Sequence, residues 1–476
     1  MTKQLLTDMY GRHFGRPCTQ IAELPQSGSN RRYYRLTDGR QTAIGVWSRC
    51  RAENEAFVAF SRQLAEAGIR VPQIYATDLD RDVYLQQDLG DTTLYALASR
   101  LRAEGHGWPD ELTDIYRRVL DDLVAIQLDG GRHIDYSLCY PRNDFDRRSM
   151  MWDLHYFKYY FVKLAHIPFD EQRLEDDFET LADYLLQADA TGFLYRDFQS
   201  RNIMIVDGQP WFIDYQGGRR GAPHYDVASL LFDAKADIPD HIRTQLLHHY
   251  TTRLQQRTAI DPADFENRFY AFVLIRIMQA MGAYGYRGFY ERKDHFLKSI
   301  PFALRNMELV IDRHPLPVHL PQLQAVWRAL TQSDELRRIA EPAPLTVSVV
   351  SFSYKRGWPQ DPTGNGGGHM FDCRALPNPG REARYASLTG KDRPVIDFFA
   401  RHADEMERFI DLACRMTSIS IERYAERGFA NLLIGFGCTG GRHRSVYCAE
   451  AAARRLAERF AGIRIVVKHL EQGDRL

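Results

Sequence analysis

The sequence lacks a net charge, and this absence limits the partners that it suggests. Its 476 residues include 62 Lys and Arg against 62 Asp and Glu. General nucleic-acid binders and membrane-surface binders are usually basic, so the charge predicts neither class. Residues 345–476 alone hold a small excess, 20 basic against 15 acidic residues. This excess fits a small anionic ligand and leaves RNA open as a partner of that segment.

The sequence also lacks the cysteine spacing of a zinc site and the apolar run of a membrane span. None of its 7 cysteines sits in a CxxC pair, and their odd, scattered set is typical of reduced thiols. The start of the chain has no apolar signal-peptide core, and no apolar run reaches the roughly 18 residues of a membrane helix. We therefore expect a cytoplasmic protein with no membrane partner.

Two α/β domains separated by a proline-containing linker are predicted. Residues 1–335 begin with strand and hairpin signals, including an Asp38-Gly39 turn, and continue mainly with helical patterns. This order predicts a protein-kinase-like bilobal fold with a small α/β lobe and a large helical lobe. The linker is placed at 336–344 and a small α/β domain at 345–476. Within the latter, the Gly- and Pro-rich stretch 355–382 is predicted to have no regular structure.

The stretch "YRDFQSRN" carries the strongest functional signal, because it places Asp197 five residues before Asn202. Asp214 follows at the end of the apolar run "WFID". Phosphoryl transfer needs a carboxylate that orients and deprotonates the attacking hydroxyl, and oxygen ligands for Mg²⁺ on the nucleotide. The pattern therefore predicts Asp197 as the catalytic residue, with Asn202 and Asp214 as the Mg²⁺ ligands. Asp226 begins a predicted helix, as an N-cap or as a structural acid.

Residues 1–335 resemble the aminoglycoside phosphotransferase (APH/choline kinase) superfamily, and within it the bacterial cell-wall sugar kinases of the AmgK type. The resemblance is carried by "SGSNRRYYRL", "LQQDLGDTTLY", "YRDFQSRNIMI" and "FIDYQGGRRGAPHYDVASLL". It implies an ATP- and Mg²⁺-dependent kinase of cell-wall recycling. The acceptor would be the anomeric hydroxyl of N-acetylmuramate, N-acetylglucosamine or a related sugar. A regulatory protein with a degenerate kinase lobe is the alternative.

Two segments of the front lobe resemble the family's nucleotide loop and hinge, and imply an ATP site. The residues implied are Ser27, Gly28, Ser29, Asn30, Arg31, Arg32, Arg35, Gln87, Asp88 and Leu89. Gly45 stands where protein kinases place a strand lysine. One of the three arginines is therefore expected to supply the charge for the phosphates. Which residue then pairs with the helix acid, Glu53 or Glu55, stays open.

Two aromatic segments of the helical lobe, 153–161 and 276–291, are candidates for the acceptor site. Aromatic rings stack on sugar faces, and Arg276 or Arg287 could bind a carboxylate. Such stripes are also typical of packed helix cores, and both interpretations stay open.

The stretch "GFGCTGGRHRS" has the C-x5-R spacing of cysteine phosphatases, from Cys438 to Arg444. In those enzymes a thiolate attacks a phosphate that the loop cradles. A predicted strand precedes the loop and a predicted helix follows it, which is a favourable place for an anion. Gly437 replaces the histidine that such phosphatases usually carry, and no acid loop is evident. We expect the loop to bind a phosphate without attack by Cys438.

Residues 345–472 resemble the C-terminal domain of RapZ, through "SFSYKRGWP", "FDCRALPNP", "LTGKDRPV" and "GCTGGRHRSVY". The resemblance implies a sugar phosphate or nucleotide sugar as ligand, with RNA binding and homo-oligomer formation as further possibilities. The ligand contacts implied are Lys355, Asp372, Arg374, Asn378, Cys438, Thr439, Gly440, Gly441, Arg442, His443, Arg444 and Ser445. A local salt bridge is the alternative for Asp372 and Arg374.

Overall fold

A computed structural model describes residues 2–25, 31–105, 107–339, 345–361, 368–427 and 429–474. The chain divides into two compact units, Met1–Ala340 and Glu341–Leu476. The first unit has a strand-rich small lobe and a helical large lobe, and the second is α/β with a parallel sheet. The predicted fold class is therefore confirmed.

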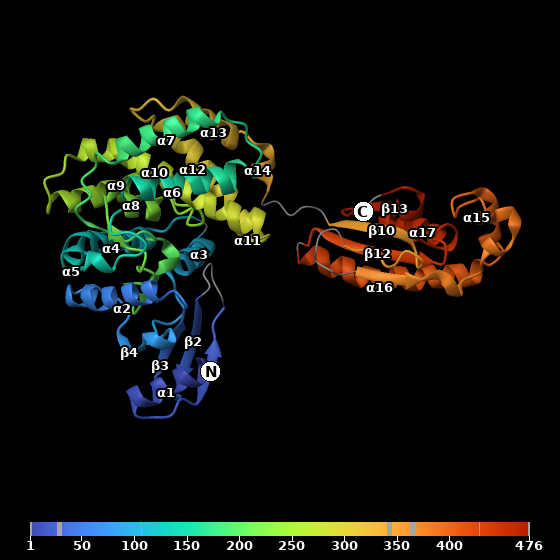
Figure 1. Cartoon of the computed structure of the whole chain (residues 1–476), viewed down its shortest axis with the longest axis horizontal. Coiled ribbons are helices and arrows are strands. Elements are labelled where there is room, and N and C mark those ends of the chain that lie inside the picture. The colour runs from blue at the N-terminus through green and yellow to red at the C-terminus, as the bar shows by residue number, and fades with distance from the viewer. Residues whose placement is uncertain are drawn as a thin grey trace. The chain divides into compact units, whose positions relative to one another are not determined.

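The small lobe is an antiparallel sheet of five strands with a helix on each side (Figure 1). The strand order is β1-β2-β3-β5-β4. The strands are β1 (Gln20–Glu23), β2 (Arg32–Thr37), β3 (Thr42–Trp47), β4 (Ile74–Asp78) and β5 (Val83–Gln87), and the helices are α1 (Thr2–Phe14) and α2 (Arg51–Glu66). The predicted hairpin at Asp38-Gly39 joins β2 and β3.

The face of this sheet that packs on α1 explains why β3 has no lysine at Gly45. Leu6 of α1 packs with Leu36 of β2 in an apolar cluster on that face. A Cβ atom at Gly45 would lie 2.8 Å from Leu6 Cδ2 and 3.0 Å from Leu36 Cδ1. Because side chains alternate between the two faces of a strand, a lysine here would enter this cluster and point away from α2.

The large lobe packs its helices around α10, a long helix whose side chains are largely buried. The helices are α3 (Leu94–Gly105), α4 (Asp110–Ala125), α5 (Gly131–His133), α6 (Arg147–Phe157), α7 (Glu171–Leu185), α8 (His224–Leu231), α9 (Asp240–Gln255), α10 (Pro262–Tyr284), α11 (Asp294–Leu297), α12 (Ile300–Arg313), α13 (Pro321–Thr331) and α14 (Asp334–Arg338). Two short antiparallel strand pairs carry the segment of Asp197 and Asp214. They are the pair β6 (Phe193–Leu194) with β9 (Arg219–Arg220) and the hairpin β7 (Ile203–Val206) with β8 (Gln209–Phe212).

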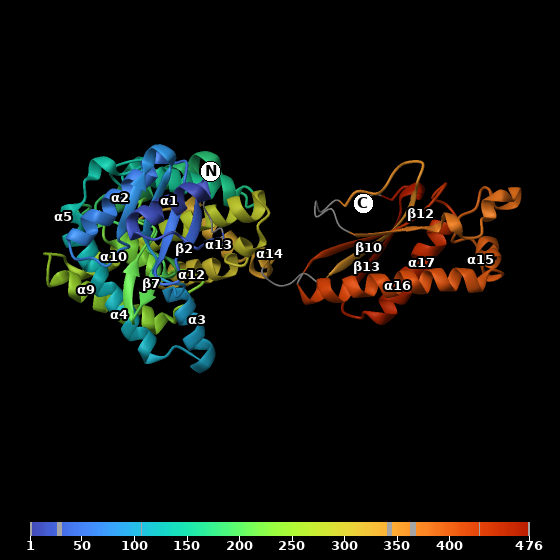
Figure 2. The ribbon, with the colours of Figure 1, turned by 90° about the horizontal axis from the view of Figure 1, so that it is seen from below.

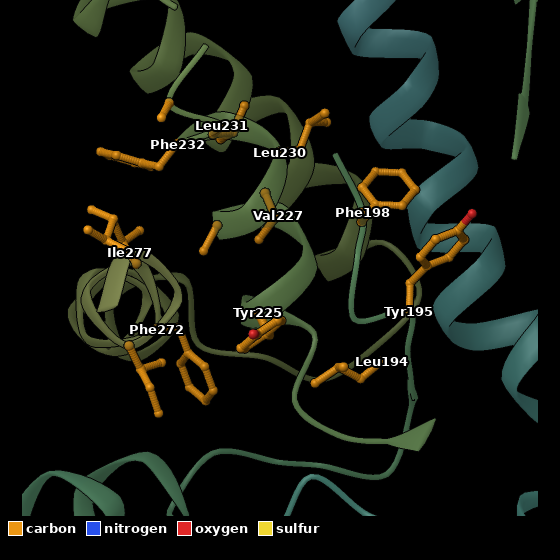
Figure 3. Packing of buried hydrophobic residues seen from close by; sticks show 14 of the residues in the cluster. Leu194, Tyr195, Phe198, Tyr225, Val227, Leu230, Leu231, Phe232, Phe272 and Ile277 are labelled. Atoms are coloured by element: carbon orange, nitrogen blue, oxygen red, sulfur yellow. The ribbon is translucent and has the colours of Figure 1, made fainter. Parts of the chain in front are cut away.

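The catalytic segment rests on the apolar core of this lobe. Figure 3 shows α8 residues lying between the segment that precedes Asn202 and the helix α10. The labelled residues are Leu194, Tyr195 and Phe198 of the segment, Tyr225, Val227, Leu230, Leu231 and Phe232 of α8 and its end, and Phe272 and Ile277 of α10. Large buried side chains beneath a loop limit its movement, because cores are close-packed.

The second unit is a parallel four-stranded sheet with the order β11-β12-β10-β13 (Figure 2). Its elements are β10 (Thr346–Ser353), β11 (Gly368–Asp372), β12 (Asn431–Cys438), β13 (Arg464–His469), α15 (Arg393–Ala400), α16 (Ala403–Glu426) and α17 (Arg444–Arg459). The prediction that 355–382 has no regular structure is wrong at β11. That strand gains its hydrogen bonds from β12, a partner more than fifty residues away that local composition does not reveal.

No helix among the described residues is long and apolar enough to cross a membrane.

Candidate active site and anion-binding loop

The catalytic loop is attached to α8 through the buried carboxylate of Asp226. This side chain accepts hydrogen bonds from the backbone N–H groups of Tyr195 at 2.7 Å and Arg196 at 3.0 Å. Burial raises the pKa of Asp226 to about 7, although the two N–H donors lower it. Of the two interpretations of Asp226, the structure therefore supports the structural acid.

Arg196 holds the backbone directly before Asp197 in a strained conformation. Its φ is +83°, a region that non-glycine residues rarely adopt. Its guanidinium binds both oxygens of Asp153 on α6, at 2.6 and 2.7 Å, and the Tyr225 hydroxyl at 2.8 Å. Bidentate pairs of this kind fix orientation as well as charge, so they stabilise the strained loop.

The three residues predicted for phosphoryl transfer meet at one point. Asn202 Nδ2 donates to the backbone carbonyl of Asp197 at 2.8 Å and to Asp214 Oδ2 at 3.2 Å. Asp214 reaches this position through a turn with φ +72°. Gln216 Nε2 donates to Asp214 Oδ1 at 2.8 Å, a contact that sequence reasoning missed. Its only signal in the sequence is a position two residues after Asp214.

This cluster has the donor chemistry of a Mg²⁺ site. Burial, and then the nearby Asp197 carboxylate, raise the pKa of Asp214 to about 6. The buried Oε1 of Gln216 accepts no hydrogen bond from the described residues. Among those residues no three His, Cys, Asp or Glu side chains could hold a metal together. Mg²⁺ commonly takes one or two carboxylates and completes its shell with water and substrate phosphates, so the residues present fit it.

Arg31 forms the ion pair of the small lobe that faces this cluster. Its guanidinium lies 2.8 Å from Glu53 of α2 and is almost completely buried. The charge of Arg31 also acts on Asp214, where it lowers the pKa against the effect of burial. Of the two helix acids left open, Glu53 is therefore paired with Arg31, while Glu55 pairs with the exposed Arg51.

The other residues predicted for the nucleotide have different surroundings. Arg32 lies on the α1 side of β2, with its guanidinium 5.7 Å from the ring centre of Trp47. Arg35 pairs with Asp88 at 2.7 Å and Asp91 at 2.9 Å, and thus ties β2 to the hinge. Gln87 ends β5, and the Leu89 side chain is buried. Ser27, Gly28, Ser29 and Asn30 lie outside the described residues.

The two aromatic segments of the large lobe pack together and have two different sides. Phe157, Phe161 and Phe289 belong to the core or pack against it. The opposite side is a tyrosine cluster at the surface, formed by Tyr156, Tyr160, Tyr286 and Tyr290. Gly285 permits the close approach, since a Cβ there would meet the Tyr160 carbonyl. Each segment therefore has one side that packs in the helix core and another side whose rings lie at the surface.

The two arginines predicted for an acceptor carboxylate already have partners. Arg287 forms an ion pair with Glu291 at 3.1 Å. Arg276 is buried and donates to the Ser229 hydroxyl at 3.0 Å and to the side-chain oxygen Oε1 of Gln279 at 2.6 Å.

In the second unit, the loop from Cys438 to His443 joins the carboxyl end of β12 to the amino end of α17. Gly441 has φ +66°, and a Cβ there would meet Glu471 and the Ser353 backbone. The helix has no side-chain cap at His443, and the N–H groups of 439–443 donate to no described residue. Free N–H groups at a helix N-terminus attract an anion.

Cys438 and Arg444 both already contact other groups of the second unit. Cys438 is 3% exposed, and its Sγ lies 3.2 Å from the Ser445 hydroxyl. Arg444 directs Nη1 at the backbone carbonyls of Arg374 (2.7 Å) and Leu376 (3.2 Å). Arg444 therefore fastens the upstream segment to the loop.

The remaining predicted ligand contacts line the same end of the sheet. Asp372 and Arg374 form the local salt bridge that was the alternative, at 2.6 Å. Asn378 accepts from the Gly380 N–H at 3.2 Å, and His443 Nε2 lies 2.8 Å from the Tyr385 carbonyl. Lys355 follows the end of β10. Thr439, Gly440 and Arg442 are exposed within the loop.

Both units match known families. Residues 20–262 match the phosphotransferase enzyme family, and residues 345–473 match the RapZ C-terminal domain. A "nucleotide-binding protein" of Rubrobacter xylanophilus is 43% identical over 143 residues, which are 29% of this chain and 45% of that protein. The chain spans about half the length of the curated relatives that it matches.

Solved structures with a fold like that of the first unit include a choline kinase and an ethanolamine kinase. A choline kinase from Cryptosporidium parvum covers 68% of this chain and 99% of its own, with 11% identity and a TM-score of 0.46. An ethanolamine kinase from Plasmodium vivax covers 61% of this chain and 82% of its own, also with 11% identity and a TM-score of 0.46.

The raised pKa of Asp214 predicts that its ionisation destabilises the ligand-free fold. A carboxyl with a folded pKa of about 6 binds more protons in the folded than in the unfolded state between roughly pH 4 and 6, so stability falls as pH rises through that window. Because asparagine does not ionise, Asp214→Asn removes this fall in stability. Thermal unfolding without nucleotide or Mg²⁺ should show the variant about 1 kcal/mol more stable than wild type at pH 7.5.

Asp207→Asn is the matched control, because Asp207 is an exposed aspartate that also has a positive φ, +50°. Asp207→Asn should have the melting temperature of the wild type at pH 7.5 and at pH 4. The added stability of Asp214→Asn over the wild type should shrink as the pH falls toward 4. A lower melting temperature for Asp214→Asn at pH 7.5 would contradict the prediction.

Proposed function

The chain belongs to the phosphotransferase enzyme family, and we propose that it transfers a phosphoryl group from ATP to a hydroxyl of a small amino sugar. The contact cluster of Asp197, Asn202 and Asp214 carries this proposal. The acceptor that we favour is N-acetylmuramate, N-acetylglucosamine or a close relative, with its anomeric hydroxyl attacking. An intact cluster on a rigid loop favours activity over the alternative of a degenerate kinase lobe.

Each residue of the cluster has one task in this reaction. Asp197 orients the acceptor hydroxyl and takes its proton as the bond to phosphorus forms. Asn202, Asp214 and the free oxygen of Gln216 would hold Mg²⁺, which neutralises charge on the phosphate oxygens. Arg31 takes the role that a strand lysine has in protein kinases. It reaches the same space from the end of the nucleotide loop, and Glu53 holds it there.

The surface tyrosine cluster supports a sugar as the acceptor. Tyr156 lies one turn beyond Asp153, the residue that anchors Arg196 beside the catalytic Asp197. Tyr156, Tyr160 and Tyr286 offer ring faces and edges at this side of the large lobe. Aromatic rings of this kind stack against the apolar faces of sugar rings.

For the second unit we propose that the loop 438–443 binds the phosphate of a sugar phosphate or nucleotide sugar. Its support is the row of N–H groups that donate to no described residue at an uncapped helix start. The exposed Arg442 and Lys355 add positive charge. A kinase product carries such a phosphate, so the second unit would sense or retain what the first unit makes.

Turnover with a panel of free sugars tests the kinase proposal. Wild-type protein should consume ATP with at least one of N-acetylmuramate, N-acetylglucosamine or glucosamine, and not with choline or an aminoglycoside. Asp197→Asn should lower kcat by about 100-fold or more, because general-base catalysis is lost. Asp207→Asn serves as the control and should keep full activity. Turnover that is insensitive to Asp197→Asn, or absent with every sugar, would contradict the proposal.

The role of Arg31 predicts a contrast between neighbouring arginines. Arg31→Gln should raise the KM for ATP and lower kcat, together about 100-fold in kcat/KM, because a charged phosphate contact is lost. Arg32→Gln should change kcat/KM less than threefold, since Arg32 lies on the opposite face of β2. If the two substitutions changed kcat/KM equally in steady-state kinetics, the assignment of Arg31 to the phosphates would be wrong.

Binding to the loop is tested on the full chain by calorimetric titration with N-acetylglucosamine 1-phosphate, a product expected from attack by the anomeric hydroxyl. Arg442→Gln should weaken binding about tenfold, since one charge-assisted contact is removed. Arg427→Gln is the control, because this exposed arginine follows α16 at the other end of the sheet. If wild type binds neither this ligand nor a nucleotide sugar, or if both substitutions act alike, the loop does not have this role.

A further inference from the structure

Gln86 is a buried glutamine whose amide forms no hydrogen bond with the described residues. It is the last residue but one of β5, and its side chain is 8% exposed. The amide oxygen Oε1 is buried without a partner, and Nε2 donates to no described residue. A buried amide without a partner lowers the stability of the fold, so it calls for a functional explanation.

Gln86 lies on the face of the small-lobe sheet that is directed at the catalytic cluster. Because side chains alternate along a strand, Gln86 shares this face with Tyr84, whereas Leu85 packs in the cluster on the α1 side. The Tyr84 ring stacks on Phe57 of α2, with ring centres 5.3 Å apart. Burial raises the pKa of Tyr84, and the Asp214 carboxylate contributes to the rise. This is therefore the face on which the kinase proposal places the nucleotide.

Strand pairing sets two rows of side chains across this face, and they run from a phosphate end to a base end. Arg31 directly precedes β2, and its charge acts on Asp214, so the phosphate end lies there. The other end adjoins the hinge, because β5 ends at Gln87 and Arg35 pairs with Asp88. A nucleotide with its phosphates at Arg31 would therefore have its base at the second row. The first row is Tyr33, Val46 and Tyr84, and the second row is Arg35, Ile44 and Gln86.

The other groups at the second row leave the edge of the base to Gln86 and to the hinge backbone. Ile44 is apolar and offers a contact to the face of a base. Arg35 is engaged with two acids of the hinge. The N–H of Leu89 in the hinge donates to no described residue. Of the side chains in this row, Gln86 alone has hydrogen-bonding groups without a partner among the described residues.

We propose that Gln86 binds the group at carbon 6 of a purine base, and that the kinase therefore uses GTP as well as ATP. This inference rests on the proposed kinase function and names its phosphoryl donors. Adenine carries an amino group at this carbon, which donates, and guanine carries a carbonyl oxygen, which accepts. A glutamine amide has both an acceptor oxygen and a donor NH₂ group, so rotation of the Gln86 amide lets it pair with either base.

Binding of three nucleoside diphosphates tests the proposal without the acceptor sugar. ADP, GDP and purine riboside 5′-diphosphate, which has only hydrogen at carbon 6, are each titrated calorimetrically with Mg²⁺ present. Wild type should bind ADP and GDP with Kd values within about tenfold of each other, and the purine analogue about tenfold more weakly than ADP. Gln86→Met keeps the side-chain volume and removes the amide. It should weaken ADP and GDP about tenfold but the purine analogue less than about twofold, because only the first two lose a hydrogen bond.

Gln73→Met is the matched control, because Gln73 is an exposed glutamine directly before β4. It should leave the three Kd values unchanged. If Gln86→Met weakened all three ligands alike, or if the wild-type Kd for GDP lay beyond the expected range, the inference would be overturned and the kinase proposal would stand. Binding of none of the three by wild type would instead overturn the kinase proposal, and the inference with it.

Discussion

The catalytic loop is held in place by one buried carboxylate, Asp226, and the rest of the kinase site depends on it. Asp226 has no counter-charge among its hydrogen-bond partners. The N–H groups of Tyr195 and Arg196 stabilise it, together with the more distant Gln127 Nε2 at 3.4 Å. Leaving such a group without its donors costs about 1–3 kcal/mol or more. The loop therefore cannot shift without a large loss of stability, and Arg196 keeps its positive φ for the same reason.

A fixed loop allows the site to gather like charges that would otherwise move apart. Burial, and then the charge of Asp197, raise the pKa of Asp214 to about 6. Ionisation of Asp214 therefore lowers the stability of the ligand-free protein. A divalent cation or a proton would relieve the repulsion between the Asp197 and Asp214 carboxylates. The Asn202 amide connects the two residues, because it donates to the backbone carbonyl of Asp197 and to Asp214 Oδ2. This is the pattern expected where stability is given up for ligand binding.

The sequence was informative where contacts are local and less so where they are not. Asn202 is the fifth residue after Asp197, so their proximity followed from spacing alone. Gln216 was missed because its contact depends on the left-handed turn at Asp214, which no local pattern predicts. The alternation of side chains along β2 would have separated Arg31 from Arg32. The strand β11 was missed because its hydrogen bonds come from β12, far away in the chain.

In the proposed function, the two units would bind anions by different physical means. In the kinase unit, the charge of Arg31 is paired with Glu53, so it is positioned without a large excess. The second unit offers backbone N–H groups at an uncapped helix start, together with the exposed Arg442 and Lys355. Backbone donors carry only partial charge, so they bind a phosphate with less attraction than arginine and release it more readily. A loop of this kind suits a unit that senses a phosphate, whereas charged side chains suit one that must order a reacting complex.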